Sequence, residues 1–480
     1  MTAGLVSRAA RLDRVLRAIT IGVLAPLTAW VIMRWFAEPV DFHIYRYASV
    51  WALHGSDIYA RDITGPGIGG HGLPYTYTPF ALLALLPTAL ASWSAAYHTW
   101  GLAAAFAVAW AENAVVVRVI PRGSGTRRAA ILACALTLTA ASTMIVNEIS
   151  RGQVNSLLML ACLADLFRSR HGRLARLIPP GTLVGVATAI KLTPGLFICY
   201  FVVTRQWRLA LNSALAAAAC MIAAAAVYPA MSEQFLTSVI WHLPHLVAFG
   251  HTFSSSGNNS IQGILAAIGP WTSPLRTPSS VAVAALGLLA ARVCHRLGHE
   301  LEAWLITGIT AQLASPVSWA HHWIWLAPAV LLAVPYARTR VQRTGTALAV
   351  VMLLIGSSAG QYLLVYGPTW ALPLALLQRE CLVAVGIWCC IMFLIHSIQA
   401  ARDQAPETDA GWSMRLIDAG QQVEMGRAEL AIKCQADDPL DQRSRSASRA
   451  PASLILVPKC PEGRLQISNQ PSDLRRDCRI

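Results

Sequence analysis

Long apolar segments recur throughout the first 397 residues of this sequence, and each is near the roughly 20 residues that an α-helix needs to cross a bilayer. Of the 480 residues, 55% are hydrophobic and 13% are charged, whereas about a quarter of a soluble domain is charged. The apolar runs are continuous rather than alternating, which disfavours a transmembrane barrel. The sequence therefore predicts an all-α, multi-span membrane protein.

The positive charge is confined to this apolar part. Residues 1–397 hold 26 Lys and Arg against 12 Asp and Glu, while residues 398–480 hold 12 of each. In a membrane protein such an excess marks cytoplasmic loops, so we expect membrane lipids and no nucleic acid as partners. The 11 cysteines lack CxxC spacing, so neither a disulfide framework nor a zinc site is predicted.

The positive-inside rule gives a topology. Four arginines precede the first apolar stretch, which we interpret as a retained signal anchor with a cytoplasmic N-terminus. The loop 37–93 is then outside, and its apolar piece 78–90 is interpreted as a re-entrant or interfacial helix, because a crossing there would place the basic residues 118–128 outside. Further helices are predicted near 94–117, 129–146, 153–167, 181–190, 195–204, 209–228, 279–294, 301–314, 319–335, 345–366 and 374–397.

This threading predicts about twelve crossings of the cell membrane, with both termini cytoplasmic. It divides the chain into a membrane catalytic domain, residues 1–397, and a polar cytoplasmic tail, residues 398–480. The tail lacks a sustained apolar period and contains the low-complexity run "DQRSRSASRAPAS". We therefore predict that the tail is largely disordered.

The polar clusters of the membrane part fall together on the predicted outer face. Such residues are costly at membrane depth unless they line a cavity, so we predict a polar pocket there. The candidate site residues are Glu38, Asp41, Tyr45, Tyr75, Tyr77, Arg151, Gln153, Asn155, Lys191, Asn258, Asn259, His321 and His322.

Two charged candidates each have a structural alternative. Asp41 follows Pro39 before a short predicted helix, so it is either the N-cap of that helix or a catalytic base, with Glu38 as the fallback base. Lys191 is the one lysine among 25 arginines in residues 1–397. Its compact ammonium suits a phosphate oxygen, whereas the alternative is a side chain that snorkels at a helix end.

The uncharged candidates have alternatives of the same kind. His321 and His322 either belong to an interfacial aromatic belt or contact a phosphate or sugar, and no further metal ligand lies near them in sequence. The Asn258–Asn259 pair either caps the next helix or binds sugar. Tyr75 and Tyr77 either stack on a sugar or sit at the interface. Helix capping explains only part of the set Arg151, Gln153 and Asn155.

One carboxylate among basic groups suits sugar transfer from a lipid phosphate carrier. The carboxylate takes a proton from the acceptor hydroxyl, and cationic groups steady the leaving phosphate. Because a phosphate leaves without a general acid, one aspartate with Lys, His and Arg suffices. A base on the face opposite the leaving group implies inversion at the anomeric carbon.

Six motifs in order resemble one enzyme family. They are "DFHIYRYASVWALHGSDIY", "LPYTYTPFALLALLP", "RGQVNSLLMLACLADL", "GVATAIKLTPGLFICYFVVTRQWRLA", "GNNSIQGIL" and "SPVSWAHHWIWLAP". Together they are similar to the bacterial polyprenyl-phosphate-mannose-dependent α-mannosyltransferases of the GT-C superfamily, which include mycobacterial α-1,2-mannosyltransferases of phosphatidylinositol mannosides and lipoarabinomannan. The motifs lie within residues 38–328.

The resemblance implies a GT-C fold, a periplasm-facing active site and a polyprenyl-phosphate-mannose donor. From it we expect transfer to a lipid-linked glycan, of phosphatidylinositol mannoside or lipomannan type, through an α-1,2 linkage, and we separately predict no cofactor. Asp41 matches the family's catalytic base, and of the matching histidine pair we expect His322 to be essential. Asn259 departs from the family, which more often has Gln there, and this bears on sugar or acceptor contacts.

Two other functions stay open on the sequence. A polyprenyl-phospho-arabinose-dependent arabinofuranosyltransferase would use the same scaffold. A lipid or sugar transporter would carry out no chemistry, but transporters tend to have broken helices in both halves. Here only the pair 181–204 is broken, which disfavours transport.

Overall fold

The computed structural model describes residues 2–68, 72–121, 125–167, 177–247, 257–355 and 378–403. The chain divides into two units, residues 1–405 and 406–480, and all the described residues belong to the first. The described part is helical apart from loops and isolated bridge residues, such as the pair Ile63 and Leu73. The all-α prediction is confirmed, whereas the predicted disordered tail lies almost wholly outside the described residues.

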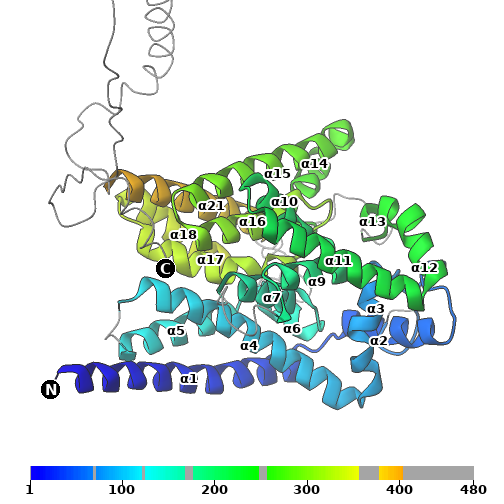
Figure 1. Cartoon of the computed structure of the whole chain (residues 1–480), viewed down its shortest axis with the longest axis horizontal. Helices are drawn as coiled ribbons and strands as arrows, with labels where there is room; N and C mark the ends of the chain where they lie inside the picture. The colour runs from blue at the N-terminus through cyan, green and yellow to red at the C-terminus, as the bar shows by residue number, and fades with distance from the viewer. Residues whose placement is uncertain are drawn as a thin grey trace, which may run out of the picture. The chain divides into compact units, whose positions relative to one another are not determined.

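The elements appear in chain order in Figure 1. They are α1 (Thr2–Trp35), α2 (Val40–Leu53), α3 (Pro79–Leu90), α4 (Trp93–Val119), α5 (Gly125–Ala140), α6 (Thr143–Ser150), α7 (Asn155–Phe167), α9 (Thr182–Ile190), η1 (Thr193–Gly195), α10 (Leu196–Val203), α11 (Trp207–Val227), α12 (Pro229–Gln234), η2 (Phe235–Val239), α13 (Ile240–Val247), α14 (Ile261–Ile268), η3 (Pro270–Thr272), α15 (Ser273–Arg296), α16 (Glu300–Ala314), η4 (Ala320–Trp325), α17 (Leu326–Ala333), η5 (Val334–Tyr336), α18 (Arg340–Ile355) and α21 (Gln378–Asp403).

Within the described ranges, 5 helices are long and apolar enough to cross a membrane. They are Arg8–Trp35, Trp93–Val119, Trp207–Val227, Pro270–Arg296 and Glu380–Asp403. The chain is therefore a multi-span membrane protein, as predicted, while the count of about twelve crossings stays a prediction. α9 and α10 have 9 and 8 residues, so each reaches roughly half-way across a bilayer core.

Local sequence signals explain where several helices begin. The side chains of Thr78, Ser92 and Ser142 accept hydrogen bonds from the first turns of α3, α4 and α6. Some elements differ from the prediction. The predicted helix 129–146 ends at Ala140, and α6 starts after the Ser142 cap. No membrane-crossing helix was predicted between 228 and 279, but this stretch is largely helical where it is described and contains α12, η2, α13 and α14.

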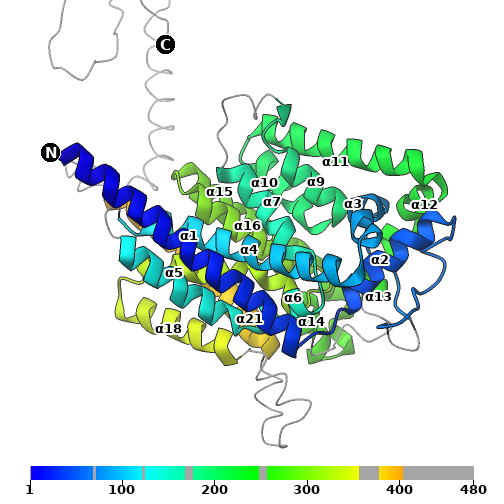
Figure 2. The same ribbon diagram turned by 90° about the horizontal axis from the view of Figure 1, so that it is seen from below.

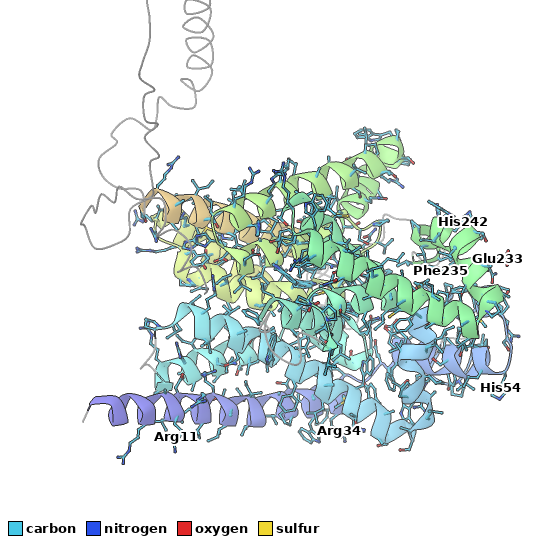
Figure 3. All side chains as sticks on the ribbon, in the orientation of Figure 1. Arg11, Arg34, His54, Glu233, Phe235 and His242 are labelled. Carbon is cyan, nitrogen blue, oxygen red and sulfur yellow. The ribbon has the colours of Figure 1, made fainter. Side chains whose placement is uncertain are left out.

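The helices pack as neighbouring pairs around a buried centre. α1 lies along α4 and α5, α2 pairs with α3, and α9 lies against α11 (Figures 1 and 2). α16 is buried on every side from Leu301 to Leu313, as expected for a helix at the centre of a bundle. α2, α3, α12 and α13 gather at one end of this unit, where Figure 3 labels His54, Glu233, Phe235 and His242.

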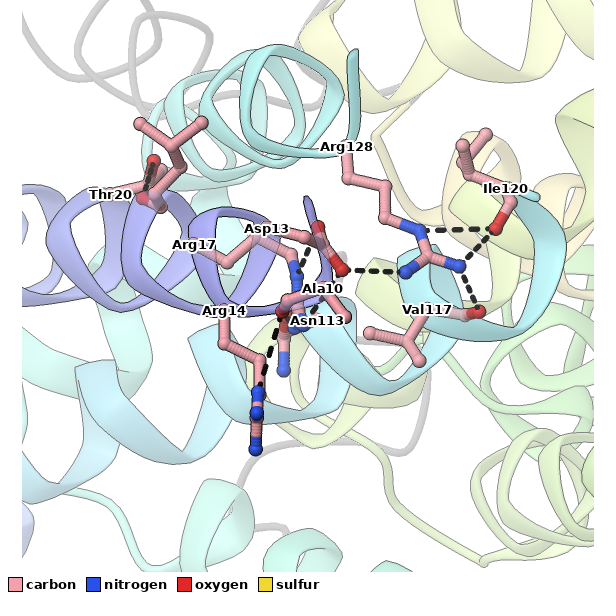
Figure 4. A network of polar contacts seen from close by, with 10 residues as sticks. Ala10, Asp13, Arg14, Arg17, Thr20, Asn113, Val117, Ile120 and Arg128 are labelled. Carbon is pink, nitrogen blue, oxygen red and sulfur yellow. Dashed lines mark hydrogen bonds and ion pairs between the residues drawn. The ribbon is translucent and has the colours of Figure 1, made fainter. Parts of the chain in front are cut away.

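A buried ionic cluster joins α1, α4 and α5 (Figure 4). The carboxylate of Asp13 lies 3.1 Å from Nε of Arg17 and 2.7 Å from Nη1 of Arg128. Arg17 also donates to Asn113 on α4 (2.5 Å), and Arg128 donates to the carbonyl groups of Ile120 and Val117. Both arginines pair with the same aspartate, so they hold these helices together. Their charge therefore has a structural role besides its contribution to the positive charge of the membrane part.

Candidate active site

A cavity of about 860 Å³ opens where the α6–α7 turn, the α9–α10 turn and η4 meet the start of α2. The predicted site residues that line it are Asp41, Tyr77, Arg151, Gln153, Lys191, Asn259, His321 and His322. The structure thus brings together side chains that are as much as 281 positions apart in the sequence, from Asp41 to His322.

Asp41 lies in the first turn of α2, one residue beyond the helix start at Val40. Pro39 occupies the N-cap position, and no side chain caps this helix, so the N-cap interpretation of Asp41 is wrong. Burial raises the pKa of the Asp41 carboxyl, while Arg151, Gln153 and Lys191 act in the opposite direction. A raised pKa makes a carboxylate a stronger base, which favours the catalytic interpretation.

The start of α2 is held against the end of α6 by backbone hydrogen bonds. The amide of Glu38 donates to the carbonyl of Ser150 (3.2 Å), and the amide of Phe42 donates to that of Arg151 (3.0 Å). Gly152 follows with φ of +70°, and a Cβ there would lie 2.5 Å from Cβ of Phe42. The "RGQ" turn therefore needs glycine, both for its backbone and for the close approach of α2.

Gln153 connects the aspartate to a pair of tyrosines. Its Oε1 accepts from the hydroxyl groups of Tyr45 (3.4 Å) and Tyr77 (3.3 Å), which also bond to each other at 2.7 Å. A hydrogen bond between Gln153 and Asp41 lowers the pKa of that carboxyl. The hydrogen bonds to Oε1 thus hold the Gln153 side chain in place next to the Asp41 carboxylate.

Lys191 turns into the cavity at the end of α9. Its Nζ donates to Oδ1 of Asn155 (2.7 Å), lies 3.1 Å from Nε2 of His322, and lies 5.5 Å from the ring centroid of Tyr77. These contacts do not fit a side chain that extends to a bilayer surface. Burial lowers the pKa of Lys191 to about 8, against the opposing effect of Glu148 and Asp41.

Both histidines are buried and line the cavity. Nδ1 of His322 accepts the amide of Trp319 at 3.2 Å, and Nε2 of His321 has no hydrogen-bond partner among the described residues. Burial lowers the pKa of both rings well below the ordinary value, and the Lys191 charge adds to this. Both imidazoles are therefore neutral at pH 7, and the positive charge of the cavity comes from Lys191 and Arg151.

The sequence profile of glycosyltransferase family 87 matches residues 75–316, half of the chain. The chain belongs to glycosyltransferase family 87. Its relatives include the polyprenol-phosphate-mannose-dependent alpha-(1-2)-phosphatidylinositol mannoside mannosyltransferase of Mycolicibacterium smegmatis, which is 29% identical over 426 residues, covering 82% of this chain and 92% of the relative. The enzyme of that name from Mycobacterium tuberculosis is 27% identical over 330 residues, covering 65% and 74%.

The name of a third relative gives a different acceptor. The M. smegmatis polyprenol-phosphate-mannose-dependent alpha-(1-2)-phosphatidylinositol pentamannoside mannosyltransferase is 29% identical over 333 residues, covering 68% of this chain and 77% of the relative. No solved structure shows a significant match. The chain is therefore a glycosyltransferase whose predicted family is confirmed at modest identity.

Several predicted residues of this family 87 chain lie outside the cavity. Glu38 is exposed, with 69% of its side chain accessible, and pairs with Arg151 at 3.5 Å. Tyr45 and Tyr75 are buried in the core. Asn155 does not line the main cavity but reaches it through Lys191.

The asparagine pair organises the loop before the histidines. The side chain of Asn258 donates to the carbonyl of Pro316 (3.2 Å) and accepts the amide of Ser318 (3.0 Å). Asn259 donates to the carbonyl of Ser318 at 3.1 Å. The N-cap of α14 is Ser260, which accepts the amide of Gly263 at 3.1 Å, so the capping interpretation of the pair is wrong.

Sequence reasoning missed Glu148, a buried residue of α6. Its Oε2 accepts from Nδ2 of Asn155 (3.0 Å), and its Oε1 accepts the amide of Ser156 (2.5 Å). Glu148 therefore orients Asn155, whose other amide atom receives Lys191. The available signal was a carboxylate within a short apolar stretch, "TMIVNEIS", where an unpaired charge would be costly.

Proposed function

We propose that this chain is an inverting mannosyltransferase. In this proposal it moves mannose from polyprenyl-phosphate-mannose to a lipid-linked glycan, of phosphatidylinositol mannoside or lipomannan type, and forms an α-1,2 linkage on a GT-C fold. The observation that carries the proposal is the Asp41 carboxylate in one cavity with Lys191 and Arg151. The names of the family relatives support the donor and the acceptor class.

The chemical step assigns one role to each charged side chain. Asp41 takes the proton of the acceptor hydroxyl, and the hydroxyl oxygen forms a bond to the anomeric carbon. The bond between that carbon and the phosphate oxygen breaks, so polyprenyl phosphate leaves with the bonding electrons. Lys191 and Arg151 stabilise the phosphate charge, and the neutral His322 adds a hydrogen bond. Attack opposite the leaving group inverts the anomeric centre.

The cavity wall fits a substrate with a long apolar part. Its lining includes apolar side chains from the α9–α10 turn, η2, α13 and the loop before η4, namely Leu192, Leu196, Phe235, Ile240, Leu243, Val247 and Val317. Such a wall suits a polyprenyl chain, while the charged groups suit its phosphate head. In the proposed topology the cavity opens on the outer face of the membrane.

The proposal is tested by Asp41→Asn, which removes the base with little change of size. Membranes that contain this variant should transfer about 10²–10⁴-fold less labelled mannose from polyprenyl-phosphate-mannose. The matched control is Asp62→Asn, an exposed carboxylate in the loop between α2 and α3. Transfer by Asp41→Asn at the wild-type rate would show that Asp41 is not the base.

The same assay separates the donor sugars and the transport alternative. Labelled polyprenyl-phospho-arabinose is supplied in a parallel reaction, and incorporation from it alone would replace mannose in the proposal. Absence of transfer from either donor, together with movement of labelled lipid across vesicles, would favour a transporter.

A further inference from the structure

Away from the Asp41 cavity, a cluster of side chains that can ligate a metal lies where α15 turns into α16. His299 is the N-cap residue of α16, Glu302 lies in its first turn, and His396 comes from α21. One ligand atom of each residue lies within 4.8 Å of the ligand atoms of the other two. None of the three lines the Asp41 cavity, so the proposed transfer does not use them.

Hydrogen bonds and ion pairs between the described residues account for only some of the polar atoms in this cluster. The Glu302 side chain is 1% exposed, and its Oε1 accepts from the hydroxyl of Tyr336 (2.5 Å) and lies 3.5 Å from Nδ1 of His299. Within the described residues, Oε2 of Glu302 and Nδ1 of His396 are buried and have no hydrogen-bond partner. An ion pair between His299 and Glu302 accounts only for Oε1. Leaving such atoms unsatisfied costs about 1–3 kcal/mol each.

Tyr336 contacts two members of the cluster. Its hydroxyl fixes the carboxylate of Glu302, and its ring stacks on the His396 ring with centroids 3.5 Å apart and an interplanar angle of 4°. Hydrogen bonds and packing of this kind orient the ligands in metal sites. Two of the three candidate ligands are therefore held in place by one residue.

We propose that His299, Glu302 and His396 bind one divalent metal ion of the zinc class. Two imidazole nitrogens and one carboxylate oxygen match the ligands of zinc, whereas magnesium and calcium prefer oxygen. A tetrahedral zinc ion holds its ligand atoms about 3.4 Å apart, so a small shift of the side chains closes the site. The partial exposure of His299 and His396 leaves room for water as the fourth ligand.

A metal at this position ties the start of α16 to α21. These two helices pack against each other, and α16 runs from the cluster to Ala311 and Ala314, which line the Asp41 cavity. The ligands lie 3 and 94 positions apart in the sequence, so no ligand-spacing motif revealed them. We expect the ion to stabilise helix packing and to take no part in chemistry.

The test measures metal content in the full-length chain. The protein is purified in detergent through a tag without histidine, incubated with zinc, desalted and analysed by mass spectrometry. The wild type should retain about one zinc per chain, while His396→Gln and Glu302→Gln, which keep side-chain size, should retain less than about a tenth of that. His98→Ala, an exposed histidine of α4, is the control and should match the wild type.

Two further measurements make the result decisive. Cobalt in place of zinc should give the visible absorption of a tetrahedral site in the wild type, and not in His396→Gln. A chelator should lower the melting temperature of the wild type and leave that of Glu302→Gln unchanged. Equal zinc content in the wild type and both ligand variants, or no zinc in the wild type, would overturn the proposal.

Discussion

At the scale of single residues, the roles proposed for Lys191 and Asp41 predict opposite limits on the pH range of activity. Burial raises the pKa of Asp41, and the base works only when ionised, so kcat/KM should rise as pH rises through that raised value. Burial lowers the pKa of Lys191 to about 8. Because the phosphate needs a charged lysine, kcat/KM should fall as pH rises through about 8. The expected dependence of kcat/KM on pH is bell-shaped.

Lys191→Arg tests the alkaline side of this profile. A guanidinium stays charged at every pH of the assay, so the decrease near pH 8 should disappear, although the larger side chain lowers the maximal rate. Glu148→Gln removes a charge that raises the pKa of Lys191, and should move the decrease to lower pH. Profiles of kcat/KM in membranes measure both effects. An alkaline limit that is the same in Lys191→Arg and the wild type would exclude Lys191 as its source.

At the scale of elements, the α6–α7 turn determines where α2 places Asp41. Gly152→Ala puts a side chain into a backbone with φ of +70° and against Phe42. The strain should cost about 1–3 kcal/mol, lower the melting temperature and reduce transfer. Gly22→Ala in α1 is the control, because no heavy atom lies within 4 Å of its added Cβ. A melting temperature equal to that of the wild type would show that this turn tolerates a side chain.

The ionic cluster of Asp13, Arg17 and Arg128 also determines how helices pack. Breaking a buried pair from one side costs about 3–5 kcal/mol. Asp13→Asn strips a partner from two arginines, so it should lower the melting temperature more than Arg128→Met, and the double variant should lower it less than the sum of the two. Arg14→Met, an exposed arginine of the same helix, is the control. Additive effects would argue against coupling.

The sequence predicted helices better than it predicted contacts between them. Apolar runs placed α4, α7 and α11 within a few residues of their ends, because burial in lipid or protein acts on every residue of a run. The roles of Glu148 and Gln153 depend on which side chains meet after packing. No local pattern carries that information. The hydrogen bonds from Glu148 through Asn155 to Lys191, and the cluster of His299, Glu302 and His396, were therefore found only in the structure.

At the scale of the whole molecule, helix direction and charge both support the proposed orientation. Several helices lead from the cavity end to arginine-rich ends, as α10 and α17 do. The basic residues at those far ends are Arg118, Arg127, Arg205, Arg208, Arg292, Arg296, Arg338, Arg340 and Arg343, together with Arg8, Arg11 and Arg14 at the start of α1. Figure 3 shows Arg11 in the N-terminal half of α1 and Arg34 at the other end of this helix, shortly before α2 begins. Arginine excess marks the cytoplasmic side.

This orientation predicts the labelling of single cysteines in intact cells. In a variant without reactive native cysteines, Asp62→Cys in the α2–α3 loop should react with a membrane-impermeant maleimide, while Thr339→Cys before α18 should react only after lysis. Both positions are exposed, so burial does not limit either reaction. The reverse pattern would place Asp41 on the cytoplasmic face. A lipid-borne donor would then have to reach the cavity from the inner leaflet, and the proposed outer-face transfer would fail even if Asp41 proved to be the base.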